Sequence, residues 1–394
     1  MTISISNAVG ATHVFIGIFL VALILSLRRR SDSEVFSVSL THELKGLAIL
    51  AIIFSHIGYF LVNDHQFLFP LSIMAGVGVN LFLFLSGFGL VVSSLQKKYS
   101  IWQFYQKRLL KLLIPFWITL AVFFVANFFI FKIGYTGGYI MQSFLGYFPR
   151  ADLSLDINSP LWYFTFILFY YVIFPVVFIR KHPCVSALVV YGISYYIIQL
   201  NPVFLKEVMR LYEVHILAFP IGMFIGGMFF SPNKVRNYLA DKFKLLATRF
   251  RETNLAVKIR HHKENKSWQH RLLDAAKQTG EVGLIISLLA LIFYTAYYSG
   301  VGELPDVEQA ISLITMAAIL ALFLLKKVDI NLFHIFGFYS YEIYLLHWPI
   351  LSHYDLFLRF MPAWLAVVLY LGLFLVLGLL LKKISRVIFA FLYH

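Results

Sequence analysis

Residues 44–62 of the chain have the sequence LKGLAILAIIFSHIGYFLV. Apart from Tyr59, only Lys45 and His56 carry ionisable side chains in this stretch, and the other residues are mostly apolar. An α-helix of this length rises by about 28 Å, close to the thickness of the hydrocarbon core of a bilayer. The stretch therefore predicts a transmembrane helix with Lys45 at one end and His56 in its interior.

Similar apolar stretches recur from one end of the chain to the other. Hydrophobic residues make up 60% and charged residues 13% of the 394 residues, and the mean hydropathy is +0.80. Soluble domains have about a quarter charged residues, so this composition excludes a soluble globular enzyme. We predict an all-α polytopic transmembrane helical bundle with about eleven spans. The spans are 11–27, 44–62, 73–94, 112–131, 161–179, 184–200, 211–230, 282–299, 309–325, 333–352 and 363–381.

The 33 Lys and Arg residues, which give the chain a formal net charge of +14, are distributed unevenly between alternate loops. When Arg28–Arg30 are placed in the cytoplasm, nearly all basic residues fall on that side. The exceptions are Lys132, Arg150, Lys206, Arg210 and Arg359. Because basic loops stay cytoplasmic, the N-terminus is predicted outside and the C-terminus inside. The excess charge follows from topology, and no nucleic-acid partner is expected.

Residues 1–43 are predicted to form an additional N-terminal transmembrane anchor with a basic linker, ahead of a main transmembrane domain at 44–394. Arg28–Arg30 follow the first apolar stretch, whereas a cleavable signal peptide carries its positive charge in front. The single cysteine, Cys184, cannot form an internal disulfide or a cysteine-based metal site. No metal site is predicted.

Two predicted loops are longer than simple connections. The outer segment 132–160 either covers an external opening or is a flexible surface loop. The inner segment 231–281 is strongly basic, and its apolar residues between Val235 and Phe250 keep helical spacing. It is therefore either an interfacial amphipathic helix facing anionic lipid, with a possible attraction for an anionic cofactor, or a solvated basic loop.

Lys45 and His56 are eleven residues apart. In an α-helix this spacing corresponds to about 16 Å along the axis and about 20° around it, so both side chains lie on one face. The arrangement suits a ligand whose anionic group stays at the cytoplasmic surface while its reactive end reaches a general base at mid-membrane. The alternatives are a histidine that hydrogen-bonds another helix and an interfacial lysine that extends to the surface.

The predicted span 333–352 contains the polar sequence SYEIYLLHWP at 340–349. Ser340, Tyr344 and His347 share one stripe of a helix, whereas Glu342 is about 140° away from His347. Glu342 cannot orient His347 within that helix and must pair with another helix or face a cavity. These groups form either a polar cluster inside the bundle or interhelical hydrogen bonds.

Other polar residues in or near the spans could either belong to a functional site or stabilise the bundle. In the third span, Asn80 and Ser86 could line a passage, while the nearby glycines favour close helix packing. Before the fourth span, Arg108 and Lys111 form part of a basic patch that could bind phosphate or lipid head groups.

Five segments in sequence order resemble membrane acyltransferase family 3, a bacterial group that includes O-antigen and exopolysaccharide acetyltransferases and nodulation-factor acetylases. Lys45–His56 resembles its Arg/Lys-x10-His signature. The other four resemble its Phe-Phe-x-x-Ser-Gly-Phe, Arg-x-x-Arg-x-x-x-Pro, Leu-Trp-Phe-Leu and Ser-Tyr-x-x-Tyr-Leu-x-His-x-Pro segments. They are Asn80–Phe88, Arg108–Pro115, Leu161–Phe164 and Ser340–Pro349.

The resemblance implies an acyl-CoA donor, usually acetyl-CoA, as a co-substrate on the cytoplasmic side, with no permanently bound cofactor. It implies a sugar hydroxyl as the acceptor on the outer side. His56 would be catalytic, and Lys45, Arg108 and Lys111 would neutralise the phosphates of CoA. The remaining candidates for acceptor alignment or proton handling are Glu342, Tyr344, His347, Asn80, Ser86 and Trp162.

The chain departs from the family pattern in four respects. A first span precedes the motif helix, Lys45 replaces the commoner arginine, no extracytoplasmic hydrolase-like domain follows the bundle, and the 231–281 loop has no counterpart in the pattern. A separate extracytoplasmic partner could therefore contribute to acceptor selection.

We expect an acyltransferase of the bacterial inner membrane that modifies a surface or exported polysaccharide, or its lipid-linked precursor. Two other functions are compatible with the sequence: a transporter or glycan exporter with a His56, Glu342 and His347 pathway, and a catalytically inactive partner protein. The acceptor sugar, the acyl group, direct transfer versus an acyl-enzyme, and the oligomeric state are not determined by the sequence.

Overall fold

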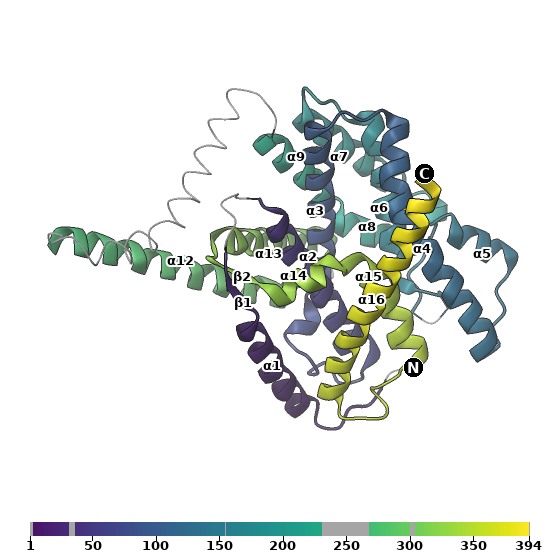
Figure 1. Cartoon of the computed structure of the whole chain (residues 1–394), viewed down its shortest axis with the longest axis horizontal. Helices are drawn as coiled ribbons and strands as arrows, with labels where there is room; N and C mark the ends of the chain where they lie inside the picture. The colour runs from purple at the N-terminus through teal and green to yellow at the C-terminus, as the bar shows by residue number, and fades with distance from the viewer. Residues whose placement is uncertain (1–2, 31–35, 154, 231–267, 300–303, 394) are drawn as a thin grey trace.

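The computed structural model describes residues 3–30, 36–153, 155–230, 268–299 and 304–393. It consists almost entirely of helices (Figure 1). The long helices are α1 (Ala8–Leu25), α2 (Val38–Ser55), α3 (Ala75–Gln96), α4 (Ile101–Phe131), α6 (Trp162–Val177), α7 (Pro183–Leu200), α9 (Ala218–Phe230), α12 (Trp268–Ser299), α13 (Pro305–Leu325) and α16 (Ala363–Tyr393). The short ones are α5 (Gly137–Phe144), α8 (Met209–His215), α14 (Asn331–Phe338) and α15 (Ser340–Pro349).

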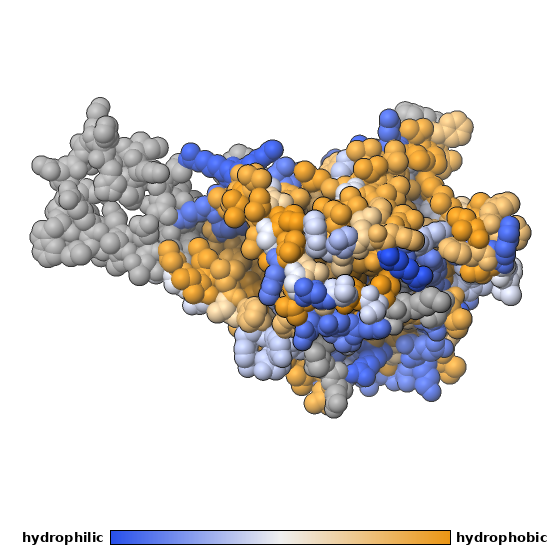
Figure 2. Space-filling view, turned by 90° about the horizontal axis from the view of Figure 1, so that it is seen from below, coloured by the Kyte–Doolittle hydropathy of each residue, from blue (hydrophilic) through white to orange (hydrophobic). Residues whose placement is uncertain are grey.

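The described residues contain ten helical segments that are long and apolar enough to cross a membrane. Large hydrophobic side chains are exposed on many of them, and hydrophobic residues cover broad areas of the surface in Figure 2. An apolar exterior of this extent is expected for helices that contact lipid. The chain is therefore a multi-pass, all-α membrane protein, as its composition predicts.

The predicted span 333–352 is not one helix. It is divided into α14, α15 and a final π-helical turn, Ile350–Tyr354, with a break at Tyr339, where φ is −108° and ψ is 10°. The break follows from the packing of α14 against α2. A Cβ on Gly46 would overlap the carbonyl oxygen of Phe333, and a Cβ on Gly337 would overlap the carbonyl oxygen of His42. The two backbones touch at these glycines, so α14 follows α2 and the chain must then change direction.

Two helix boundaries also differ from the predicted spans. The second helix begins at Val38 rather than near residue 44, because the Ser37 side chain accepts a hydrogen bond from the backbone N–H of Leu40 and caps it. α12 begins at Trp268, inside the segment predicted as a loop; its N-terminal part extends away from the other helices in Figure 1, and the helix also packs against α13. The amphipathic helix predicted between Val235 and Phe250 lies outside the described residues.

Contacts near the ends of the helices join segments that the alternation of spans places on one side. On the predicted inner side, β1 (Leu27–Arg29) pairs antiparallel with β2 (Val328–Ile330). On the predicted outer side, the hydroxyl of Tyr354 donates to Asn127 Oδ1 over 2.7 Å. The broken segment 331–354 therefore connects the two ends of the bundle and takes the place of the tenth predicted span, 333–352.

The segment 132–160, which is predicted to lie outside, is fixed by buried polar contacts among its described residues. Arg150 Nε pairs with Asp156 Oδ1 at 2.7 Å, and Asp156 is only 3% exposed. The Tyr139 hydroxyl accepts a hydrogen bond from the N–H of Ile157, and burial raises the pKa of this phenol to about 12, so it stays neutral. Asn158 donates to the carbonyl of Leu345 in α15. These contacts favour a segment that shapes this end of the bundle, predicted to be the outer one, over a flexible loop.

Candidate active site

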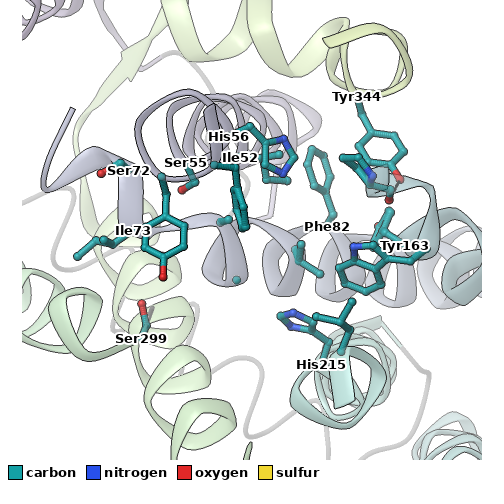
Figure 3. Close-up of a pocket in the computed structure, with 18 of the residues that line it drawn as sticks. Ile52, Ser55, His56, Ser72, Ile73, Phe82, Tyr163, His215, Ser299 and Tyr344 are labelled. Atoms are coloured by element: carbon teal, nitrogen blue, oxygen red, sulfur yellow. Dashed lines mark hydrogen bonds between the residues drawn. The ribbon is translucent and has the colours of Figure 1, made fainter. Parts of the chain in front are cut away.

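A cavity of about 230 Å³ lies within the bundle and is lined from several helices. His56 lies at the junction of α2 with the π-helical turn His56–Leu61, and His215 ends α8. Figure 3 shows these two histidines on opposite sides of the cavity, with Tyr163 and Tyr344 along one wall.

His56 is held by a second histidine. Its Nδ1 lies 2.7 Å from Nε2 of His347 in α15, and the two ring planes are inclined by only 3°. The ring of Trp348 packs edge-on against His56, with the centroids 5.0 Å apart. His347 is fully buried, whereas His56 is partly exposed and lines the cavity. The sequence motifs 45–56 and 340–349 thus meet at this pair.

The hydrogen bonds fix the neutral tautomers of both rings. His347 Nδ1 lies 2.8 Å from the carbonyl oxygen of Tyr344, and a carbonyl can only accept, so this nitrogen carries the proton. Nε2 of His347 is then unprotonated and must accept from Nδ1–H of His56. The remaining nitrogen of His56, Nε2, has a free lone pair. This is the arrangement required of a general base.

The close contact between α2 and α14 brings the two motifs together. Gly46 and Gly337 let the helices touch, and α15 follows α14 after the break at Tyr339. α15 therefore returns towards the end of α2, where His56 is located. A continuous helix in place of α14 and α15 would carry His347 along a different line.

The cavity contains a second oriented histidine that the sequence analysis did not select. Nδ1 of His215 lies 2.8 Å from Oδ1 of Asn80, and Nδ2 of Asn80 donates to Oγ of Ser312 over 2.8 Å. All three residues are buried, and they come from α8, α3 and α13. The sequence left open whether Asn80 lines a passage or lies at a helix contact; in the structure it is buried and links α8 to α13. Spacing within one helix gives no sign of such a partner.

Aromatic residues form the wall between the two histidines. The indole of Trp162 lies almost parallel to the His215 ring, inclined by 16° with the centroids 5.8 Å apart. Tyr163 packs edge-on against Tyr344, whose hydroxyl donates to the carbonyl of Pro160. Trp162 and Tyr344, both predicted site residues, therefore line the same cavity as His56.

The predicted basic residues lie mainly at the end of the bundle that is predicted to be cytoplasmic. Lys45 interacts electrostatically with Lys382 of α16, with Arg108 of α4 and with Glu342 of α15. Glu342 Oε2 lies 3.7 Å from Nζ of Lys382. Glu342 thus points away from His347, as the helical spacing requires, and sits among cations. Lys111, the third predicted basic residue, is exposed, and its Nζ lies 5.5 Å from the centroid of the Phe389 ring.

Hydroxyl groups connect the inner charges to the cavity. Ser86 of α3 lies close to Tyr163, which lines the cavity, and to Tyr171. Tyr171 in turn interacts electrostatically with Arg108, and Tyr341 interacts with both Tyr171 and Glu342. A row of polar groups therefore leads from the basic cluster at Lys45 to the aromatic wall of the cavity at Tyr163.

The model of the acyltransferase domain of acyltransferase family 3 matches residues 44–383. The chain belongs to acyltransferase family 3. No curated protein and no solved structure gives a match.

Membership of acyltransferase family 3, together with the apolar helices, makes the protein a membrane acyltransferase. The match begins one residue before Lys45, and it includes both histidines of the His56–His347 pair and the whole lining of the cavity. In this family 3 chain, α1 lies outside the matched range. Among the described residues, no group of three or more His, Cys, Asp or Glu side chains could hold a metal ion.

Proposed function

We propose that the protein transfers an acyl group, in the first instance acetyl, from cytoplasmic acyl-CoA to a hydroxyl of a surface polysaccharide or its lipid-linked precursor in the bacterial inner membrane. The observation that carries this proposal is the His56–His347 pair, which leaves one unprotonated nitrogen of His56 facing a cavity. Family membership favours acyl transfer over the transport of a glycan.

The donor would enter from the inner end. Lys45, Arg108 and Lys382 form a cationic cluster that suits the phosphates of CoA. Glu342 lies in this cluster and neutralises part of its positive charge. Along α2, Lys45 is about 16 Å from His56, so the pantetheine arm would extend past the tyrosine and serine hydroxyls towards the cavity. Lys111 is less suited to this role than Lys382, because its side chain is exposed over Phe389.

The acceptor would enter from the outer end. At the end predicted to be outside, the cavity is bounded by Tyr59, by Ser299 at the end of α12 and by Glu308 near the start of α13. Donor and acceptor would thus approach His56 from opposite ends. This favours direct transfer between two bound substrates over a covalent acyl-enzyme.

The unprotonated Nε2 of His56 would act as the general base of the reaction. His56 Nε2 takes the proton of the acceptor hydroxyl, and the oxygen attacks the carbonyl carbon of the thioester. As the tetrahedral intermediate collapses, the carbon–sulfur bond breaks and the ester forms. The proton on His56 passes to the departing CoA sulfur, which leaves as the thiol and restores the neutral imidazole.

Transfer of label from radioactive acetyl-CoA to glycan tests this function in membranes that contain the protein at matched levels. We expect His56→Ala to lower transfer by about 100-fold or more, because a general base contributes about that much. His182→Ala is the control, since His182 is exposed at the start of α7. Equal transfer by His56→Ala and the unchanged protein would overturn the mechanism. If the protein were an inactive partner protein, membranes with and without it would show the same label on glycan.

A further inference from the structure

His215 lines the same cavity as His56 but has no role in the proposed acyl transfer. His215 is only 5% exposed and lies in apolar surroundings. A histidine in such surroundings costs folding free energy unless its nitrogens form hydrogen bonds. One nitrogen is satisfied, because Asn80 Oδ1 accepts from Nδ1–H. Asn80 is held in this orientation by Ser312, since Nδ2 of the amide donates to the serine hydroxyl.

The other nitrogen of His215 is available to a ligand. Since Nδ1 carries the proton of the neutral ring, Nε2 carries a lone pair. None of the residues that the structure describes donates a hydrogen bond to it, and His215 lines the cavity. A buried acceptor of this kind is satisfied when a hydroxyl or N–H group in the cavity donates to it.

The surroundings of His215 suit a ring with several hydroxyl groups. Trp162 lies parallel to the imidazole and adds a flat apolar surface at the same wall. Gly76 leaves space beside the ring, because a Cβ there would still be 3.6 Å from Cε1 of His215. Figure 3 shows the open space of the cavity between His215 and His56.

We propose that His215 is a binding residue for the acceptor, which must carry at least two hydroxyl groups. Nε2 of His215 accepts a hydrogen bond from one hydroxyl, while His56 removes the proton from the hydroxyl that becomes acylated. Asn80 and Ser312 are the positioning residues of this second histidine. This inference rests on the proposed acyl transfer and identifies the part of the cavity that selects the acceptor.

Two substitutions separate ligand binding from a structural role. Asparagine at position 215 can keep the hydrogen bond to Asn80 but has no group at the place of Nε2, whereas glutamine reaches that place with an acceptor oxygen. Each variant is purified in detergent and reconstituted, and its folded yield is checked by size-exclusion chromatography. The probes are radioactive acetyl-CoA and a lipid-linked glycan extract of the source cells, each at several concentrations.

We expect His215→Asn to lower transfer at limiting glycan by about tenfold or more, as for the loss of one hydrogen bond that leaves a polar group unpaired. The KM for acetyl-CoA should change by less than about twofold. His215→Gln should recover most of the transfer, with an apparent KM for glycan near that of the unchanged protein.

The opposite pattern would overturn the assignment. If His215→Asn transferred label normally while His215→Gln was impaired, the histidine would serve only to link α8 to Asn80. Equal loss in both variants, or a raised KM for acetyl-CoA, would also contradict an acceptor site. If the unchanged protein transferred no label, the proposed function itself would fail, and this result is distinct from all of the others.

Discussion

His347 determines which nitrogen of His56 can act. In a histidine with two free nitrogens the proton is shared between tautomers, and only one tautomer presents an unprotonated Nε2 to a substrate. Here the carbonyl of Tyr344 fixes the proton of His347, and His347 then fixes the proton of His56. The carbonyl takes the part that a carboxylate has in other triads, without placing a negative charge in the membrane. His347 is therefore a positioning residue.

This role predicts a graded response at position 347. His347→Ala should lower kcat by about 10- to 100-fold with little change in the KM for acetyl-CoA, because it removes orientation and not binding. His347→Gln should recover part of kcat, since its amide oxygen can accept from Nδ1–H of His56. Steady-state kinetics of the two variants check this. Equal kcat values for alanine and glutamine would argue against an orienting hydrogen bond.

The contact between α2 and α14 is the structural support of this pair. At Gly46 and Gly337 the two backbones approach so closely that no side chain fits between them. Small residues at such crossings allow van der Waals contact and close approach in a membrane, where no hydrophobic force drives helices together. α14 then directs α15, and through α15 it places His347.

A single methyl group should therefore disturb both stability and activity. Gly46→Ala would place a Cβ against the carbonyl of Phe333, so α14 must move away or the variant must lose about 1–3 kcal/mol through overpacking. We expect a lower melting temperature and a fall in transfer of about tenfold or more, because a shift of about 1 Å near the reacting groups is costly. Thermal unfolding in detergent and the label-transfer assay measure the two effects.

Gly372→Ala is the matched control for this change. Gly372 lies in α16, and a Cβ there would meet nothing within 4 Å. Its melting temperature and transfer rate should stay close to those of the unchanged protein. If Gly46→Ala behaved like Gly372→Ala, the close crossing would not determine the position of His347.

A contact between two site residues can be predicted from the sequence only when both residues lie on one helix. Lys45 and His56 share α2, so their separation and common face follow from the helical repeat. Glu342 and His347 could be separated for the same reason. The partners of His347 and of Asn80 could not be predicted, because His56 and His215 come from other helices and hydropathy does not determine which faces meet.

The same limit applies to elements at the edge of the bundle. The pairing of β1 with β2 and the break at Tyr339 depend on contacts between segments about 300 residues apart or on different helices. Glu43 was overlooked, although it is fully buried and its Oε1 accepts from Lys326 Nζ at 2.6 Å and from the N–H of Ile330. A single carboxylate next to a span gives no signal in sequence that distinguishes it from a solvated residue.

The two-ended arrangement of substrates requires that the bundle has the predicted orientation, with the Lys45 cluster in the cytoplasm. The single cysteine allows a direct test: in a Cys184→Ala background, Lys97→Cys and Lys132→Cys place one thiol each at opposite ends of the bundle. Both lysines are exposed. A membrane-impermeant maleimide on intact cells, or on spheroplasts, should label Lys132→Cys and leave Lys97→Cys unlabelled until the membrane is opened. The reverse pattern would place Lys45 outside, where acyl-CoA is absent, and the donor could not then enter at the cationic cluster.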